Sequence, residues 1–347
     1  MSRIYRYPTR RAVGSDVHQA VSFVGRTADD RYPMMPVRTA IIGVGHQGRW
    51  HAQKFAALDG SELQGVVDID RTRSRDVAAE HGVESIDDIE QLVGVVDAAI
   101  VATPTPTHFE IVKRLLHNGI HVLVEKPITS TVEEARDLVE LAEAKDLVFQ
   151  VGHVERFNPA VVAMAGKIER PLYIESNRIA PFKPRGLDVC VVLDLMIHDI
   201  ELIHSFVQSP IVDLDAVGQP VFSQNIDVAN ARLRFANGCV ADVTSSRISL
   251  KTERSLRVFQ RESYLSADMH NKTFTFYEKK HDGAVRGPDD VSVEMQSFVN
   301  GDALLEQSKS FLEAVAGGPP PIVSGRAAMQ ALETAARISE MVAGPPS

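Results

Sequence analysis

The chain has 347 residues, which is enough for two domains at roughly 150 residues each. Its composition, 44% hydrophobic and 24% charged, is typical of a globular protein and excludes a disordered, collagen-like or coiled-coil chain. The formal net charge is 37 − 46 = −9, which argues against a protein that binds nucleic acid along a basic surface.

Residues 1–36 contain six Arg and three Asp but no regular hydrophobic pattern, so we predict a flexible N-terminal tail. They lack the apolar region of a signal peptide, and no apolar run of the chain approaches the ~20 residues of a membrane helix. Met34 and Met35 stand just before the first expected strand and are candidate start positions, which mass spectrometry of the native N-terminus would test.

Short runs that are apolar on both faces follow the tail and predict buried parallel strands. They cover Val37–Gly43, Leu63–Asp70, Asp97–Thr103, Ile120–Val124 and Leu147–Val151. Helical patterns alternate with these strands, and they cover Gln47–Leu58, Phe109–Asn118 and Thr131–Lys145. The last of them begins with a capping box, Thr131 to Glu134. The alternation predicts right-handed βαβ units and a doubly wound parallel sheet.

After about residue 156, longer strands with period-2 alternation replace this pattern. They cover Tyr173–Ile179, Val212–Val217, Val228–Phe235, Cys239–Ser245, Ser255–Gln260 and Thr273–Glu278. Asn237-Gly238 is typical of a hairpin turn, and two helices, Asp302–Ala316 and Gly325–Val342, close the chain. We therefore predict an α/β Rossmann domain over 37–155. An α+β domain with a large, mostly antiparallel open sheet follows over 156–347, and its last helix is a candidate to pack back on the first domain.

The sequence Gly43-Val44-Gly45-His46-Gln47-Gly48 has the spacing GxGxxG and lies between the first strand and the first helix. Glycines there let the backbone turn tightly and bring its N–H groups against a pyrophosphate at the helix N-terminus. Asp68 comes 20 residues after Gly48, where a carboxylate can accept hydrogen bonds from a ribose diol and would repel a 2′-phosphate. We therefore predict NAD rather than NADP, although Arg71 and Arg73 nearby work against that choice. The candidate cofactor contacts here are Gly43, Gly45, His46, Gln47, Gly48, Asp68 and Arg71.

Lys126, in the sequence Glu125-Lys126-Pro127, follows the fourth predicted strand, and doubly wound sheets bind ligands at the carboxyl ends of their strands. This lysine could polarise a substrate oxygen, or it could be a solvated surface residue. Asp194 and His198 lie four residues apart on an apolar helix and share one face with Glu201. Asp194 could orient His198 as a general base, or the pair could be structural. A metal site is disfavoured, because the spacing matches no known ligand motif.

Two segments near the domain junction carry basic side chains that could bind an anionic group of a substrate. They could equally form a surface ion pair and a solvated loop. The segments are VGHVERFNP (151–159) and NRIAPFKPR (177–185). The candidate substrate contacts from these segments are Arg156, Phe157, Asn158, Arg178, Lys183 and Arg185.

Four motifs in this order resemble the glucose–fructose oxidoreductase/inositol dehydrogenase (Gfo/Idh/MocA) family, from Val37 to about Ala343. They are GVGHQG (43–48), ATPTPTH (102–108), EKP (125–127) and the Asp194…His198 pair. The resemblance implies that Lys126 and His198 are the catalytic pair and that Asp194 lines the substrate site. It also implies cofactor contacts at Thr103, Pro104, His108, Glu125 and Lys126. The chain departs from the family at Thr105, where Asn is frequent, and over 187–193 (LDVCVVL), where many members are rich in glycine.

Within the family, GHVERFNPA (152–160) followed by NRIAPFKPRG (177–186) looks like the UDP-N-acetylglucosamine 3-dehydrogenases. This resemblance implies oxidation of the sugar C3 hydroxyl with NAD. It also implies a partner aminotransferase that acts on the 3-keto product for a lipid A variant with 3-amino sugars. Two alternatives stay open: another dehydrogenase of the family, acting on a UDP-sugar uronate or an inositol, and a non-catalytic dinucleotide-binding sensor.

The remaining expectations concern compartment and assembly. Cys190 and Cys239 form neither a CxxC pair nor a disulfide framework, which favours a reducing cytoplasm. Family members commonly assemble through the open sheet, which implies a homo-dimer or homo-tetramer. No metal, no nucleic acid and no membrane insertion is expected.

Overall fold

The computed structural model describes residues 35–183 and 189–343. Residues 1–34, which make up nearly all of the expected tail, lie outside the described residues, as do Arg185 and residues 344–347. In the two described stretches, no helix combines the length and the apolar character that a membrane crossing requires.

The first sheet has six parallel strands in the order β3-β2-β1-β4-β5-β6. Its strands are β1 (Val37–Ile42), β2 (Ser61–Val67), β3 (Glu84–Ile86), β4 (Ala98–Val101), β5 (His121–Glu125) and β6 (Phe149–Gly152). The strand order reverses between β1 and β4, and ligands of such sheets bind in the crevice at the carboxyl ends there. The predicted doubly wound sheet and its five predicted strands are confirmed.

Helices cover both faces of this sheet, because successive strand residues point to opposite sides. Ile42 and Val124 share one buried cluster with α3 and α4, whereas Ile41 and Leu123 share another with α1, α2 and α7. The helices are α1 (His46–Ala57), α2 (Arg71–His81), α3 (His108–His117), α4 (Val132–Ala144) and α7 (Ala303–Val315). The predicted capping box of α4 is present, since Thr131 and Glu134 hydrogen-bond each other's backbone N–H groups.

Two elements of this part were not predicted. β3 has only three residues, and of these Ile86 alone is buried, so the sequence contains no apolar run. α2 is polar along most of its length, but its ends carry clear signals. Asp70 accepts hydrogen bonds from the backbone N–H groups of Thr72 and Arg73, and Gly82 ends the helix at φ +67°. These caps could have revealed the helix.

The second sheet has eight strands in the order β14-β13-β12-β11-β7-β10-β9-β8. Its strands are β7 (Tyr173–Ile179), β8 (Ile211–Gln219), β9 (Val228–Phe235), β10 (Val240–Ser246), β11 (Glu253–Phe259), β12 (Ser263–Asp268), β13 (Thr273–Lys279) and β14 (Val291–Ser297). The predicted mostly antiparallel sheet is confirmed, with one parallel pair, β7 and β10, at its centre. β12 and β14 were not predicted, because β12 buries only Leu265 and Ala267 and β14 is nowhere fully buried.

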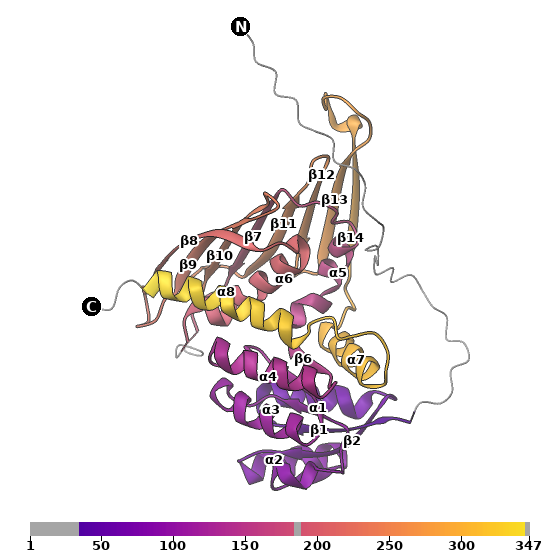
Figure 1. The fold of residues 1–347 in the computed structure, drawn as a ribbon. Coiled ribbons are helices and arrows are strands. Elements are labelled where there is room, and N and C mark those ends of the chain that lie inside the picture. Colours follow the sequence, from indigo (N-terminus) through magenta and orange to yellow (C-terminus); the bar gives the residue numbers. More distant parts are fainter. Residues whose placement is uncertain (1–34, 184–188, 344–347) are drawn as a thin grey trace. The chain divides into compact units, whose positions relative to one another are not determined.

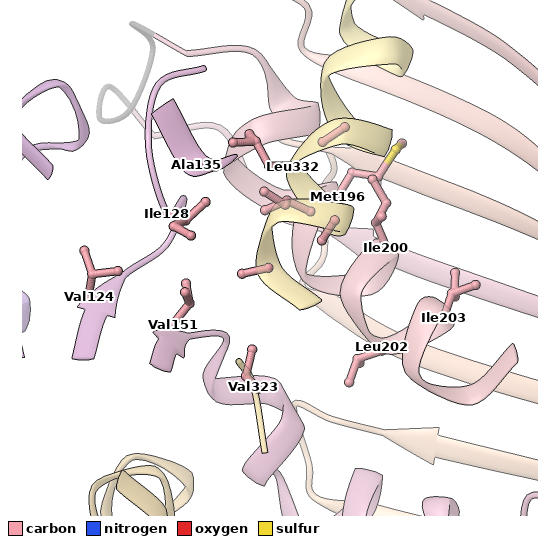
Figure 2. Packing of buried hydrophobic residues seen from close by; sticks show 14 of the residues in the cluster. Val124, Ile128, Ala135, Val151, Met196, Ile200, Leu202, Ile203, Val323 and Leu332 are labelled. Atoms are coloured by element: carbon pink, nitrogen blue, oxygen red, sulfur yellow. The ribbon is translucent and has the colours of Figure 1, made fainter. Parts of the chain in front are cut away.

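Helices α5 (Pro159–Ala165), α6 (Ile197–Val207) and α8 (Gly325–Ala343) pack on one face of the second sheet, and a π-helical turn, Val192–Met196, leads into α6. Helix α8 also contacts α4, and Figure 1 shows it (yellow) running alongside that helix. Val124 and Ala135 of the first part and Met196 and Leu332 of the second belong to one buried cluster, part of which Figure 2 shows. The division at 155/156 stays a prediction, since this core continues across it.

Strand β6 lies at the edge of the first sheet, and the segment before α8 covers that edge. Gln150 forms an antiparallel bridge with Ser324, and the Val151 N–H donates to the carbonyl of Val323 at 3.0 Å. Covering an edge in this way blocks pairing with another chain. It also ties the carboxyl end of β6 to residues that come about 170 positions later in the sequence.

Candidate active site

The glycine loop has the geometry that an approaching pyrophosphate needs. Gly43 has φ +82°, a backbone conformation that favours glycine. A Cβ on Gly48 would lie 1.8 Å from the Gly43 carbonyl oxygen, so only glycine fits there. A Cβ on Gly45 would meet nothing within 4 Å, which leaves the backbone open to a ligand. Helix α1 begins here with no side-chain cap, and exposed His46 and Gln47 form its first turn.

Asp68 links this loop to the end of β2. Its carboxylate accepts hydrogen bonds from the backbone N–H groups of Val44 at 2.8 Å and Asp70 at 2.9 Å. Lone pairs on both oxygens remain for a ribose diol. Arg73 lies 3.5 Å from Asp68 and pairs with Asp70 at 3.1 Å. Arg71 instead pairs with Asp87, so Arg73 is the arginine nearer to this carboxylate, and the cofactor contact at Arg71 stays a prediction.

His108 joins the two loops at the carboxyl ends of β4 and β5. It is 1% exposed, and its ring nitrogens lie 2.9 Å from the carbonyl oxygens of Pro127 and Thr103. The imidazole is therefore enclosed by the protein backbone, and the structure speaks against the expected direct cofactor contact. Thr103 and Pro104 remain available on the same loop, since Thr103 is half-buried and Pro104 exposed.

Glu125 pairs with a histidine that the sequence analysis did not single out. Its Oε1 lies 2.7 Å from Nε2 of His51, a buried residue of α1. Burial raises the pKa of Glu125, but the contacts with His51 and Lys126 together outweigh it and leave the pKa below its ordinary value. Gly152 of the neighbouring strand allows this arrangement, because its absent Cβ would stand 3.1 Å from the carboxylate. The pair fixes the residue that precedes Lys126.

Lys126 contacts the segment that carries Asp194. Its Nζ donates to the Asp194 carbonyl oxygen at 2.8 Å and lies 3.4 Å from the Asp194 carboxylate. Among the described contacts, Asp194 forms no hydrogen bond with His198. The prediction that Asp194 orients His198 is therefore not supported, because the π-helical turn directs Asp194 to Lys126 instead.

His198 begins the next turn and lies close to the same lysine. Burial, followed by the positive charge of Lys126, holds the pKa of His198 well below its ordinary value. The imidazole is therefore neutral at physiological pH and able to accept a proton. His153, which follows β6, meets its ring edge to face with the ring centroids 5.9 Å apart. Lys126 and His198 are thus brought together, as the sequence predicts.

Arg156 reaches the same helix one turn further along. Its Nη1 donates to Oε1 of Glu201 at 2.9 Å, and its side chain is 20% exposed. Burial raises the pKa of Glu201 to about 7, although Arg156 acts in the opposite direction. The Arg156 side chain thus stays partly accessible while it pairs with Glu201. Asp194, which is also half-buried, is accessible in the same way.

The other predicted substrate contacts are occupied within the fold. Arg178 is buried, and it pairs with both oxygens of Asp199 and with Glu155, each at 2.9 Å. Asn158 donates to Glu155 and to the Met269 carbonyl, and its Oδ1 caps α5. The buried ring of Phe157 belongs to the core cluster described above.

These three residues satisfy buried groups within the fold, which speaks against a direct substrate contact at Phe157, Asn158 and Arg178. The two remaining predicted contacts of this region are Lys183 and Arg185. Lys183 is exposed, just before the gap at 184–188, and Arg185 lies outside the described residues. Within the described ranges, no three His, Cys, Asp or Glu side chains gather in a metal-binding cluster.

Comparisons with known proteins agree with this arrangement. Residues 37–153 match the GFO/IDH/MocA family described as "Oxidoreductase family, NAD-binding Rossmann fold", and residues 164–265 match the GFO/IDH/MocA C-terminal domain. A UDP-N-acetylglucosamine 3-dehydrogenase from Acidithiobacillus ferrooxidans is 38% identical over 307 residues, which are 88% of this chain and 97% of the relative. The chain belongs to the GFO/IDH/MocA oxidoreductase family.

Solved structures of family members show the same architecture. One of the UDP-N-acetylglucosamine 3-dehydrogenase from Acidithiobacillus ferrooxidans superposes with a TM-score of 0.82 at 36% identity, and the match covers 89% of this chain and 98% of that chain. A scyllo-inositol dehydrogenase from Lactobacillus casei with bound NAD(H) and scyllo-inositol shares the fold. Its TM-score is 0.74 at 19% identity, covering 89% of this chain and 97% of that chain.

This family member is an NAD-dependent oxidoreductase, and its glycine loop, uncapped α1 and Asp68 fit the dinucleotide.

Substitutions of two loop glycines distinguish an effect on the stability of the fold from an effect on the affinity for NAD. We expect Gly48→Ala to destabilise the fold by ~1–3 kcal/mol, because its Cβ collides with a backbone oxygen. We expect Gly45→Ala to leave stability within ~0.5 kcal/mol. It should weaken NAD binding about tenfold, because a methyl group enters the open space before the loop.

Thermal unfolding and calorimetric NAD titration of both variants would measure these effects. Gly60→Ala is the matched control for both, since a Cβ there also meets nothing within 4 Å and the residue lies outside the loop. A Gly45→Ala variant with unchanged NAD affinity would argue against a pyrophosphate at this loop.

Proposed function

We propose that this enzyme oxidises the C3 hydroxyl of UDP-N-acetylglucosamine to a 3-keto sugar nucleotide. The observation that carries the proposal is the convergence of Lys126 and neutral His198 at the carboxyl end of β5, beside the glycine loop. A relative with that printed activity aligns with this chain over 97% of the relative's length. The similarity to that relative selects the substrate, and the geometry supports an alcohol oxidation.

In the proposed reaction the C3–H bond and the O–H bond of the substrate break, and a C=O bond forms. A bound NAD⁺ would supply the acceptor for the hydride that leaves C3. His198 is the leading candidate to take the hydroxyl proton, because its ring lies beside Lys126 and is unprotonated at neutral pH. Lys126 hydrogen-bonds the same oxygen and stabilises the developing alkoxide charge. Lys126 as the formal base is the alternative, and the Asp194 carboxylate beside its Nζ would then stabilise its charged form.

The diphosphate of such a substrate needs cationic side chains to bind it. Fewer of the predicted cationic side chains are free for this role than the sequence suggests. Arg178 is committed to two carboxylates, which removes the strongest candidate. We propose Arg156 as the contact at the junction, together with Lys183 and Arg185 on the 177–185 segment. The sugar would then lie toward Lys126, and the nucleotide toward the segment that precedes α6.

A panel of substrates assayed for NADH formation tests this proposal. The panel is UDP-N-acetylglucosamine, its C3-deuterated form, UDP-N-acetylgalactosamine, a UDP-sugar uronate and myo-inositol. We expect NADH from UDP-N-acetylglucosamine and transfer of deuterium from C3 to the cofactor. NADH without deuterium would contradict oxidation at C3. Turnover of inositol or the uronate alone would favour another dehydrogenase of the family, and binding without turnover would favour a sensor.

We further propose a cellular setting for this activity. A 3-keto sugar is the substrate type of an aminotransferase, so such an enzyme is the expected partner, in a pathway to lipid A with 3-amino sugars. Free thiols at Cys190 and Cys239 support a cytoplasmic location. The open face of the second sheet carries a row of aromatic contacts that includes Tyr264 and Tyr277, which supports a homo-dimer or homo-tetramer. Light scattering at micromolar concentration tests the assembly, and a monomer would contradict it.

A further inference from the structure

His153, which is buried, and His198, which is half-buried, have buried ring nitrogens without a partner among the described residues. Among the described residues, Nδ1 and Nε2 of His153 and Nδ1 of His198 have no hydrogen-bond partner. A buried polar atom left unpaired costs about 1–3 kcal/mol, so such atoms call for a functional explanation. Neither nitrogen of His153 is used by the fold or by the reaction proposed above.

The backbone fixes where His153 stands. Glu125 and Gly152 are paired residues of the adjacent parallel strands β5 and β6, so Lys126 and His153 follow at equivalent positions. The His153 N–H donates to the Val151 carbonyl at 2.8 Å, and the His153 carbonyl accepts from the Arg156 N–H at 3.1 Å. Its side chain is 1% exposed and meets His198 at an interplanar angle of 81°. The backbone of His153 is therefore fixed beside His198, while its ring keeps freedom to rotate about its side-chain bonds.

A histidine that acts as a base needs a partner for its second nitrogen. One ring nitrogen must be unprotonated toward the substrate, while the other carries the proton and donates it to an acceptor. For His198 the buried nitrogen is Nδ1. Asp194 is engaged with Lys126, so the adjacent ring with free nitrogens is that of His153. A direct contact after a small ring rotation, or one bridging water, would satisfy both residues.

We propose that His153 is the positioning residue of His198. It accepts the Nδ1–H of His198, directly or through one water, and so leaves Nε2 of His198 unprotonated toward the substrate hydroxyl. This inference rests on the proposed function in one respect, namely that His198 is the base. In this proposal His153, and not Asp194, is the residue that orients the imidazole of His198.

A neutral acceptor has a different electrostatic effect from a carboxylate. Burial, with the charges of Lys126 and Arg156, lowers the pKa of His153 to about 3, so it stays neutral and able to accept. The other groups that act on His198 are Arg178, His153 and Arg254, and a positive charge on any of them lowers its pKa. A carboxylate in place of His153 would raise the pKa of His198 and favour its protonated form. The histidine pair orients the base without that effect.

The protonation of the wild-type rings tests the inference without any substrate. In protein labelled with ¹⁵N-histidine, long-range ¹H–¹⁵N NMR distinguishes the two neutral forms of imidazole, and His198→Gln and His153→Gln assign the signals. We expect His198 to carry its proton on Nδ1. A proton on Nε2, or a charged ring at neutral pH, would overturn the inference. If this result holds while UDP-N-acetylglucosamine gives no NADH, only the substrate proposal fails.

Substitution of His153 tests its effect on the reaction. His153→Leu keeps the bulk but removes the acceptor, so we expect kcat to fall about 100-fold with KM for NAD unchanged. His153→Gln retains an acceptor and should recover most of that loss. Equal loss in both variants would indicate a structural role, and kcat of His153→Leu within about threefold of the wild type would overturn the inference. If His153→Leu does not fold, the NMR result on the wild type decides.

His204 provides the matched control for these variants. It is another histidine of α6, its Nε2 lies 2.9 Å from Oγ1 of Thr334, and its ring meets Phe235 edge to face. It lies two turns from His198, away from Lys126. We expect His204→Leu to lower the unfolding temperature slightly and to leave kcat unchanged.

Discussion

We expect Lys126→Met and His198→Gln each to lower kcat for NADH formation from UDP-N-acetylglucosamine by ~10²–10⁴-fold, the usual effect of removing a proton-transfer group. Methionine preserves the length of the lysine side chain but neither its charge nor its donors, so the alkoxide loses its hydrogen bond. Glutamine fills most of the imidazole volume but cannot take a proton near neutral pH. KM for NAD should change little, because neither side chain is needed to bind the pyrophosphate.

The two residues act on the same oxygen, so their effects should not add. We expect the double variant to be about as slow as the more impaired single variant. Lys145→Met is the control for the first substitution, since Lys145 also donates to a backbone carbonyl, that of His117 at 3.1 Å, but on an exposed surface. Near-normal turnover in both single variants would show that the chemistry lies elsewhere.

Arg178→Met is the second large effect, and it concerns stability. Removing this guanidinium leaves Glu155 and Asp199 buried without their main cation, and breaking a buried ion pair costs ~3–5 kcal/mol. Urea unfolding of the variant measures this loss. Without Arg178 both carboxyl groups have folded-state pKa values above those of the unfolded chain. The loss is therefore largest at neutral pH and shrinks as the pH falls toward about 4, where both groups take up protons.

Arg257→Met is the matched control, because Arg257 pairs with Glu175 at 3.1 Å on the exposed face of the same sheet. Its loss should cost at most about 1 kcal/mol. The kinetics of Arg178→Met, at a temperature where it is folded, separate the two roles of this arginine. A KM for UDP-N-acetylglucosamine within about threefold of the wild type is expected, whereas a rise beyond about tenfold would restore Arg178 as a substrate contact.

The parts of this site that could be predicted are those set by strand and loop geometry. The glycine loop, Asp68 and Lys126 all follow buried parallel strands, so the carboxyl-end rule places them in one crevice. The bounds of β7 and β9 were predicted to the residue, because their side chains alternate between more buried and more exposed positions. Local pattern was sufficient wherever a single segment determined the outcome.

Partners that come from distant segments could not be predicted. Arg178 lies in a basic segment that is typical of an anion site. Its partners Asp199 and Glu155 come from other segments and reach it only in the folded chain. Asp194 and His198 have helical spacing, yet a π-helical turn redirects the aspartate to Lys126. The sequence analysis included His153 in the segment 151–159 but assigned it no role. The register of β5 against β6 gave it a position beside the catalytic candidates.

The covered edge of β6 has a consequence for synthesis of the protein. A ribosome that has released the first half of the chain has already made the glycine loop, Lys126 and His153. The segment that pairs with β6, Val323 and Ser324, emerges near the end of translation, and α8 follows it. A nascent chain therefore holds the dinucleotide loop before the edge of β6 next to His153 is covered. We expect a chain truncated before Val323 to lose turnover but to retain cofactor binding.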